Sequence, residues 1–254
     1  MASSTVDIYN LALSAIGESA LVQGNEDNEL AVELCRLHYP GCLRSMLERF
    51  EWPWATRQAV LTETVSTYDS TVTYAAAATV RYEGRVYASV AGSNVGHTPD
   101  PDLTTYWTLQ YPQALGWGYV YTLPTDCVRP VAVLLDGERV TLLSSKTPFD
   151  IQRSNDGKSR VLCCDIEPGD FEAFEYIAMP SGDDYPPAYS QLFTDALVYL
   201  LASRLAGPIT KRPELSVELF KMHDMYAREA IACELNATAR DPEPSPSSIR
   251  AREA

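Results

Sequence analysis

The sequence predicts an α+β fold: a bundle of about four helices with a β-rich middle portion, a small all-β inserted domain and an extended C-terminal tail. Three observations predict this class. Apolar residues recur at helical spacing near both ends of the chain. The middle carries short runs of branched and aromatic residues separated by Gly, Pro and Asp turns. With 254 residues and 46% apolar content, the chain is long enough to bury a substantial core.

Two helices are predicted near the N-terminus. The first begins at about Thr5, with Ser4 or Thr5 as its cap, and Gly17 is expected to end it. The second runs from about Asp27 to Arg49, and Pro40-Gly41 should kink or split it. The apolar positions expected on the second helix are Leu30, Leu34, Leu37, Leu43, Leu47 and Phe50.

Two further helices are predicted near the C-terminus. One follows Pro186-Pro187 and ends at Gly207-Pro208. The other begins at Pro213, which fits a first helical position. Their apolar residues are Tyr189, Leu192, Phe193, Ala196, Leu200 and Leu201 in the first, and Leu215, Leu219, Met222, Tyr226 and Ala230 in the second.

Between these helical pairs the pattern is that of strands. Short branched or aromatic runs alternate with Gly/Pro/Asp turns such as Asp136-Gly137 and 155–157. The predicted strands are residues 119–123, 128–135, 139–143, 161–164 and 171–177.

A self-contained block interrupts this order. We assign residues 68–112 to an inserted β domain, residues 1–67 with 113–238 to a discontinuous main domain, and residues 239–254 to the extended tail. Within the insertion, residues 80–87 alternate around Glu83-Gly84 as a hairpin does, and a closing strand follows at residues 106–109.

Composition excludes several classes of function. A net charge of −14 argues against broad binding to a phosphate backbone, which requires a basic surface. The six cysteines include no CxxC pair and favour free thiols in a reducing cytoplasm. We expect no signal peptide, and no membrane, since the longest apolar run is too short to span a bilayer.

No motif in the sequence points to catalysis, a metal or a cofactor. His38, His97 and His223 lie in unrelated contexts and are expected to be surface or helix-face residues. The acidic cluster Asp165, Glu167 and Asp170 could hold a cation, but a solvated turn is the favoured interpretation. Phosphate-binding glycine loops and the nucleophile elbow are absent from the sequence. We therefore expect a protein that is not an enzyme.

The insertion resembles the chitin-binding type of small carbohydrate-binding module. Its order V-x-Y-x-G-x-x-Y, then N-x-G-x-x-P, then Tyr106-Trp107 carries the resemblance, although Ala75 to Ala78 replace the usual polar Gly-Asp. The resemblance implies a glycan platform of Tyr82, Tyr87, Tyr106 and Trp107, because aromatic faces stack on sugar rings. The favoured alternative is that these rings fill the core of a module too small to be stable without them.

The rest of the chain resembles the tail tubular protein A type of head-to-tail adaptor from tailed bacteriophages. The motifs that carry the resemblance occur in order over most of residues 5–235. They are D-I-Y-N-L-A-L-S-A-I-G at residues 7–17, residues 29–39, residues 43–55 ending E-W-P-W-A, Y-x-L-P-x-D-C-V-R within residues 116–130, and residues 185–189 with 205–210.

This resemblance implies a structural role in the virion, at the head-tail junction, after assembly in the host cytoplasm. The resemblance implies a dodecameric ring of identical copies. This ring would lie beneath the portal protein and above a downstream tail or nozzle protein. The ring continues the DNA channel, and an acidic wall lets DNA pass without sequence-specific binding. The alternative function is glycan binding through the insertion, at a virion surface or on a cell wall.

Two segments carry predictions of their own. In proteins of this resemblance the C-terminal segment docks on the portal, and Ile249, Arg250 and Arg252 are the expected contacts here, against the alternative of a frayed end. The segment Trp52-Pro53-Trp54 is either an exposed hot spot or a buried staple between the second helix and the β-rich region. We favour burial, because the segment joins two predicted elements.

Overall fold

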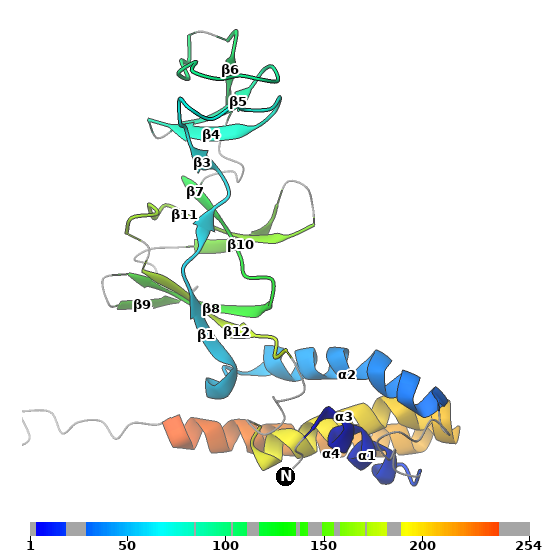
Figure 1. Ribbon diagram of the computed structural model, residues 1–254. Coiled ribbons are helices and arrows are strands. Elements are labelled where there is room, and N and C mark those ends of the chain that lie inside the picture. Colours follow the sequence, from blue (N-terminus) through cyan, green and yellow to red (C-terminus); the bar gives the residue numbers. More distant parts are fainter. Residues whose placement is uncertain are drawn as a thin grey trace, which may run out of the picture. The chain divides into compact units, whose positions relative to one another are not determined.

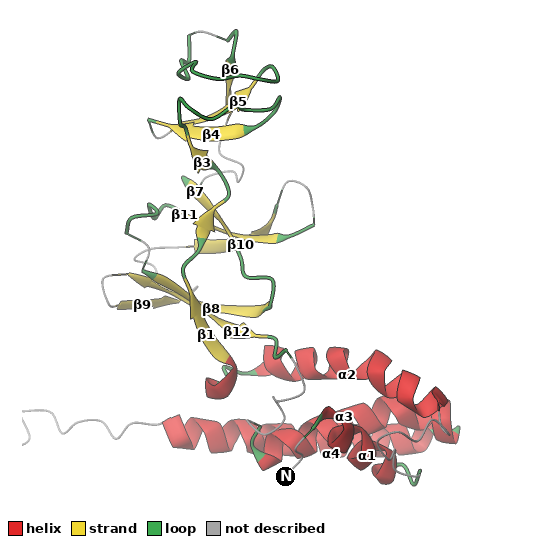
Figure 2. Cartoon of the chain, in the orientation of Figure 1, coloured by secondary structure: helices red, strands yellow, loops and turns green. Residues whose placement is uncertain are grey.

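The computed structural model describes residues 4–18, 29–83, 85–102, 104–110, 117–135, 138–141, 149–154, 158–170, 172–181 and 189–238. The chain forms two compact units, one of residues 1–56 with 179–254 and one of residues 57–178. The long helices belong to the first unit, and the strands, apart from Thr56, belong to the second. Figure 2 colours the helices red and the strands yellow. This α+β composition confirms the coarse fold class, whereas the predicted domain boundaries at residues 67, 112 and 238 stay predictions.

The helical unit is built around one central helix. Its helices are α1 (Thr5–Ala15), α2 (Glu29–Arg49), α3 (Gln191–Thr210) and α4 (Pro213–Thr238). Helices α1, α2 and α4 all pack against α3, as the lower part of Figure 1 shows. Helix α3 is therefore buried on most of its surface, from Phe193 to Ala206.

The N-terminal helix begins and ends as predicted. Ser4 caps it: the Asp7 N–H donates to Ser4 Oγ at 3.2 Å, and the Ser4 N–H donates to Asp7 Oδ2 at 3.0 Å. Beyond Ala15 the chain leaves the helix at Gly17, whose φ of +82° favours glycine.

Helix α2 differs from its prediction in the side chains that it buries. Of the two alternatives predicted at Pro40, a kink or a split, the split does not occur, since the helix runs through Pro40. Its first half is buried through the small residues Ala31 and Cys35, whereas Leu30 and Leu37 are 61% and 71% exposed. Leu30, Leu34 and Leu37 were expected to share one face, and of these three only Leu34 is half-buried. The fully buried positions of that half are small residues, whose side chains allow closer packing. The second half is buried through Cys42, Leu43, Met46 and Leu47.

Helix α3 continues past its predicted end. Ser190 caps its start, but Gly207 and Pro208 lie inside the helix, which ends at Thr210. A proline so close to the C-terminus removes only one intrahelical hydrogen bond. Thr210 Oγ1 donates to the Ala206 carbonyl at 2.7 Å, and Lys211 closes the helix in the left-handed conformation. Helix α4 begins at Pro213, as predicted.

In the Trp-Pro-Trp segment Trp52 is buried, Trp54 is half-buried and Pro53 is exposed. Trp52 is fully buried and its Nε1–H donates to the Met46 carbonyl at 2.9 Å. Its ring meets Phe193 of α3 edge to face, with centroids 4.8 Å apart. Trp54 lies 5.0 Å from the same ring. Burial is confirmed for Trp52, but these contacts tie the end of α2 to α3, not to the β-rich region as predicted.

By length and composition, α3 is also apolar enough to cross a membrane. However, 61% of that stretch is buried inside the structure, as the core helix of a bundle is. The prediction that no membrane is involved stays a prediction.

The described residues of the β-rich unit form three four-stranded sheets. Their strands are β1 (Thr56–Ala59), β2 (Thr62–Glu63), β3 (Ser66–Thr67), β4 (Thr79–Tyr82), β5 (Arg85–Ser89), β6 (Trp107–Gln110), β7 (Tyr119–Thr122), β8 (Cys127–Leu135), β9 (Glu138–Thr141), β10 (Phe149–Arg153), β11 (Arg160–Cys164) and β12 (Ala173–Ala178). Sheet A has the order β1-β12-β8-β9, sheet B β10-β11-β7-β2 and sheet C β3-β4-β5-β6.

Sheets A and B share one core. Tyr121, Leu162 and Phe149 of sheet B pack with Val133 and Phe174 of sheet A in a single buried cluster. Neighbouring cysteines of β11 face opposite sides, since Cys164 belongs to this cluster and Cys163 to a second one with Val120 and Val161. The two sheets therefore form one packed body.

Sheet C has its own small core. It is built of Tyr74, Val80, Tyr87 and Trp107. The predicted hairpin is present: β4 and β5 pair antiparallel, with Tyr82 opposite Arg85, and β6 closes the sheet on β5. A short strand that the sequence did not predict, β3, adds to β4 in parallel.

Candidate functional site

The four aromatics predicted as a glycan platform divide between core and surface. Tyr87 and Trp107 are fully buried and belong to the core of sheet C. Tyr82 is half-buried and packs at the edge of that core, with its ring 5.6 Å from that of Tyr68. Only Tyr106 is exposed, with 41% of its surface accessible. The core interpretation therefore holds for Tyr87 and Trp107, and a platform of all four rings is wrong.

Tyr106 forms a surface feature with a histidine that the sequence did not connect to it. The rings of Tyr106 and His97 stack with centroids 3.5 Å apart and an interplanar angle of 8°. Trp107 Nε1–H donates to the His97 carbonyl, and Asn94 Nδ2–H donates to the Tyr106 carbonyl at 3.0 Å. We call Tyr106 and His97 the ring pair. Because buried side chains hold its backbone on both sides, it is preorganised.

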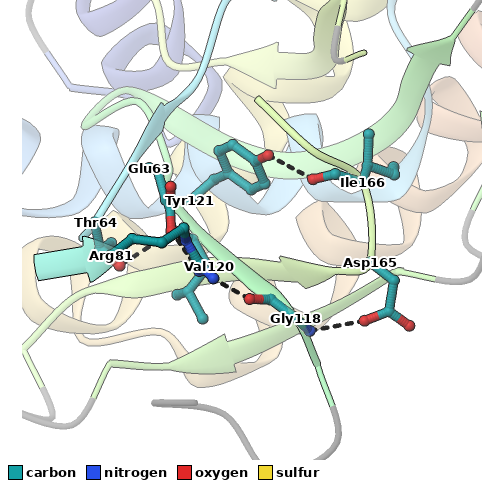
Figure 3. A network of polar contacts seen from close by, with 8 residues as sticks. All are labelled: Glu63, Thr64, Arg81, Gly118, Val120, Tyr121, Asp165 and Ile166. Atoms are coloured by element: carbon teal, nitrogen blue, oxygen red, sulfur yellow. Dashed lines mark hydrogen bonds and ion pairs between the residues drawn. The ribbon is translucent and has the colours of Figure 1, made fainter. Parts of the chain in front are cut away.

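A polar network lies where the chain passes between sheets B and C (Figure 3). Arg81 of β4 contacts the carboxylate of Glu63 on β2 at 2.6 Å, and both side chains are largely buried. Arg81 Nη2–H donates to the Gly118 carbonyl at 2.9 Å. Its guanidinium also lies 4.3 Å from the centre of the Tyr119 ring, a cation–π distance.

The acidic residues after β11 take part in the same network. The Gly118 N–H donates to Asp165 Oδ1 at 2.7 Å. Burial raises the pKa of the Tyr119 phenol, and a hydrogen bond to Glu167 acts in the same direction. Asp165 and Glu167 therefore have structural contacts, which the solvated-turn interpretation did not include. No group of three or more His, Cys, Asp and Glu able to hold a metal occurs within the described residues.

The helical unit carries a shallow depression of about 250 Å³ between α2 and α3. It is lined by Leu37, His38, Gly41, Cys42, Ser45, Leu200 and Arg204. His38 thus lies at a depression of mixed polar and apolar character.

His223 lies on a helix face, as expected, but that face is buried. Its Nδ1–H donates to the Ala196 carbonyl at 2.9 Å, and Nε2 has no partner within the described structure. Burial lowers its pKa, so the ring is neutral near pH 7.

The buried cysteine thiols are unreactive near neutral pH. Burial raises the pKa of Cys35, Cys42, Cys163 and Cys164 to about 11. Because the thiolate is the nucleophilic form, none of these four can attack a substrate near neutral pH. All six cysteines are free, and only Cys233 is exposed.

The remaining predicted site residues, Ile249, Arg250 and Arg252, lie outside the described residues. Sequence reasoning missed Arg81, Glu63 and the role of His97. The available signal was weak. Arg81 lies between Val80 and Tyr82 in a hairpin, and a polar residue at such a position can face either solvent or another part of the protein. No protein-family model matches the chain, and no curated protein matches it. The motifs and the geometry are therefore what support a function.

Proposed function

We propose that the chain is a structural, non-catalytic virion protein: a head-to-tail adaptor that forms a dodecameric ring joining the portal to the tail. One observation carries the proposal. Most motifs of the resemblance lie far apart in sequence, at residues 7–17, 29–39, 43–55 and 185–189 with 205–210, yet their described parts belong to one compact helical unit. The motif within residues 116–130 belongs to the β-rich unit. A family resemblance at both chain ends is meaningful when those ends build the same body.

Composition and chemistry support the same role. The net charge of −14 suits the wall of a channel through which DNA slides without sticking. Four of the six thiols are protonated and unreactive. The partners in this proposal are the portal, identical copies, a downstream tail or nozzle protein, and passing DNA. The place of action is the head-tail junction of the virion.

The experiment is binding to the purified portal protein by co-sedimentation. We expect the full chain to bind and a chain lacking residues 239–254 to lose attachment while its monomer stays folded. Ile249→Ala with Arg250→Ala and Arg252→Ala should weaken binding in the same way. Ser247→Ala with Ser248→Ala, in the same segment, is the matched control. Undiminished portal binding by the truncated chain would contradict docking through the tail.

Ring formation separates from docking in a second measurement. We expect the isolated protein to be monomeric or weakly associated, and to form its ring on the portal template. Light scattering of the free protein measures this directly. A stable dodecamer without portal would contradict templated assembly but would leave the ring itself in place.

The second candidate function is glycan binding through the inserted β domain. The observation that favours it is the ring pair: Tyr106 is exposed and stacked on His97, and an exposed, rigid aromatic face suits a sugar ring. We expect Tyr106→Ala to abolish retention on insoluble chitin if this candidate is right, with the exposed Val95→Ala as control. Failure of the unaltered protein to bind chitin would remove chitin as the ligand.

A further inference from the structure

Arg81 belongs to sheet C by its backbone but not by its side chain. Its backbone pairs with Thr67 and Val86 of the neighbouring strands. Its guanidinium instead leaves the sheet for Glu63, with Nε–H donating to Glu63 Oε1 at 2.7 Å. The two side chains are only 13% and 9% exposed, so the pair is shielded from water. A shielded, hydrogen-bonded ion pair is far more sensitive to loss of one partner than a surface pair is.

The same guanidinium reaches the second place where the chain joins the two sheets. Glu63 is the last residue of β2 and lies where the chain enters sheet C, shortly before β3 begins at Ser66. Gly118 lies where the chain leaves sheet C, directly before β7. Arg81 donates to the Gly118 carbonyl and lies against the Tyr119 ring. The Arg81 side chain therefore binds both segments that connect sheet C to sheet B.

The two segments that Arg81 binds, around Glu63 and Gly118, make further hydrogen bonds of their own, as Figure 3 shows. The Thr64 N–H and Oγ1–H both donate to the Val120 carbonyl, at 2.8 and 3.1 Å. The Gly118 N–H is bound by Asp165. The Tyr121 hydroxyl donates to the Ile166 carbonyl at 2.6 Å inside the shared core of sheets A and B. The residues that bind the guanidinium are thus connected through β7 to the shared core of sheets A and B.

From this arrangement we infer that Arg81 is a positioning residue that clamps sheet C to sheet B, so that the inserted β domain is a rigid arm of the β-rich unit and not a tethered module. We call the contact between sheets B and C around Arg81 and Glu63 the seam. Without the guanidinium, the Glu63 carboxylate is left shielded and unpaired, and the seam opens so that water can hydrate the carboxylate. Lysine does not replace arginine here, because a single ammonium lacks the planar fork that spans Glu63 and Gly118 and the flat face that lies on Tyr119. This inference is independent of the proposed adaptor role.

The test is a distance distribution between two spin labels in the full chain. The labels are placed at Gln58→Cys on β1 and Thr105→Cys in sheet C's loop, both exposed positions, in a Cys233→Ser background. The other cysteines are buried and do not take up label. We expect one narrow distribution in the parent. We expect Arg81→Met to give a distribution roughly two-fold broader, because the unpaired carboxylate opens the seam.

Arg85→Met is the matched control, since it removes an exposed arginine from the adjacent strand of the same sheet. It should leave the distribution narrow. If Arg81→Met unfolds the domain, Arg81→Lys and Glu63→Gln are the milder variants to measure in its place. Both should keep the fold and broaden the distribution. Equal widths in the parent, Arg81→Lys and Glu63→Gln would overturn the inference, as would a parent distribution already as broad as that of Arg81→Met.

Discussion

At the scale of single residues, the fully buried Trp52 is the clearest case of a side chain that fixes a junction. Its ring packs edge to face on Phe193, and its indole N–H satisfies the Met46 carbonyl at the end of α2. The sequence predicted that the segment is buried, because two tryptophans around a proline join two elements. It did not predict the partner, since burial of an aromatic ring is compatible with any apolar neighbour.

Trp52→Ala should destabilise the helical unit by roughly 3–5 kcal/mol, because it leaves a cavity and an unpaired carbonyl. Urea unfolding followed by circular dichroism measures the loss. Leu37→Ala, which truncates an exposed leucine of α2, should change stability by less than about 0.5 kcal/mol. Similar effects of the two substitutions would mean that Trp52 is not the packing centre.

His223 gives the helical unit a dependence on pH. Burial holds its pKa below the ordinary value of 6.5; the positive charge of Arg49 acts in the same direction, and Asp224 and the bond to Ala196 oppose it. As pH falls below about 6.5 the unfolded chain takes up a proton that the folded chain does not yet bind, so stability falls. This contribution is fully present above that pH.

His223→Gln should remove this loss, because glutamine keeps a donor for the Ala196 carbonyl without a titrating ring. The unfolding free energies of parent and variant should therefore diverge in the variant's favour between about pH 7.5 and about pH 5. Taking the difference between the two proteins cancels the carboxylates common to both. A pH-independent difference would show that His223 does not titrate with folding.

At the scale of elements, the helices were more predictable than the strands. Capping residues and a helical apolar period predicted α1 and the start of α4, since these signals are local. The end of α3 was missed because Gly207-Pro208 reads as a terminator, although a proline in the last turn removes only one hydrogen bond. Strands β1, β2, β3 and β10 were missed because short strands gain their stability from partners distant in sequence.

The two helix-associated glycines of the N-terminal half should respond in opposite ways to alanine. Gly41 lies inside α2 with open space where a Cβ would stand, so Gly41→Ala should stabilise the protein by about 0.5–1 kcal/mol. Gly17 has a φ of +82°, so Gly17→Ala should destabilise it by about 1 kcal/mol or more. Thermal unfolding of both variants measures the pair. The same sign of change in both would contradict the conformations assigned to these positions.

At the scale of the whole molecule, the described structure groups the strands of residues 57–178 into one unit, including sheet C. The sequence predicted a break between the insertion and its flanks, because the insertion carries a hairpin and a closing strand of its own, at residues 80–87 and 106–109. It had no way to indicate the Arg81–Glu63 clamp across that break, since one arginine and one glutamate far apart in sequence carry no pattern.

Deletion of residues 68–112 separates the two proposed functions. Under the adaptor proposal the remaining chain still assembles with the portal, whereas under the glycan proposal function is lost. Because the deletion also removes Arg81, it should be paired with Glu63→Gln so that no unpaired carboxylate is left. Loss of portal assembly in this paired variant, with the helical unit still folded, would argue that the insertion has a part in the main role.

If this chain is a ring subunit at the head-tail junction, as we propose, one image of the protein in its particle tests that role most directly. Electron cryomicroscopy with a label on the exposed Cys233 would locate the chain. The adaptor proposal predicts a dodecameric ring at the single vertex where the tail attaches, between portal and tail. Label found elsewhere on the particle, or no ring at that vertex, would contradict it.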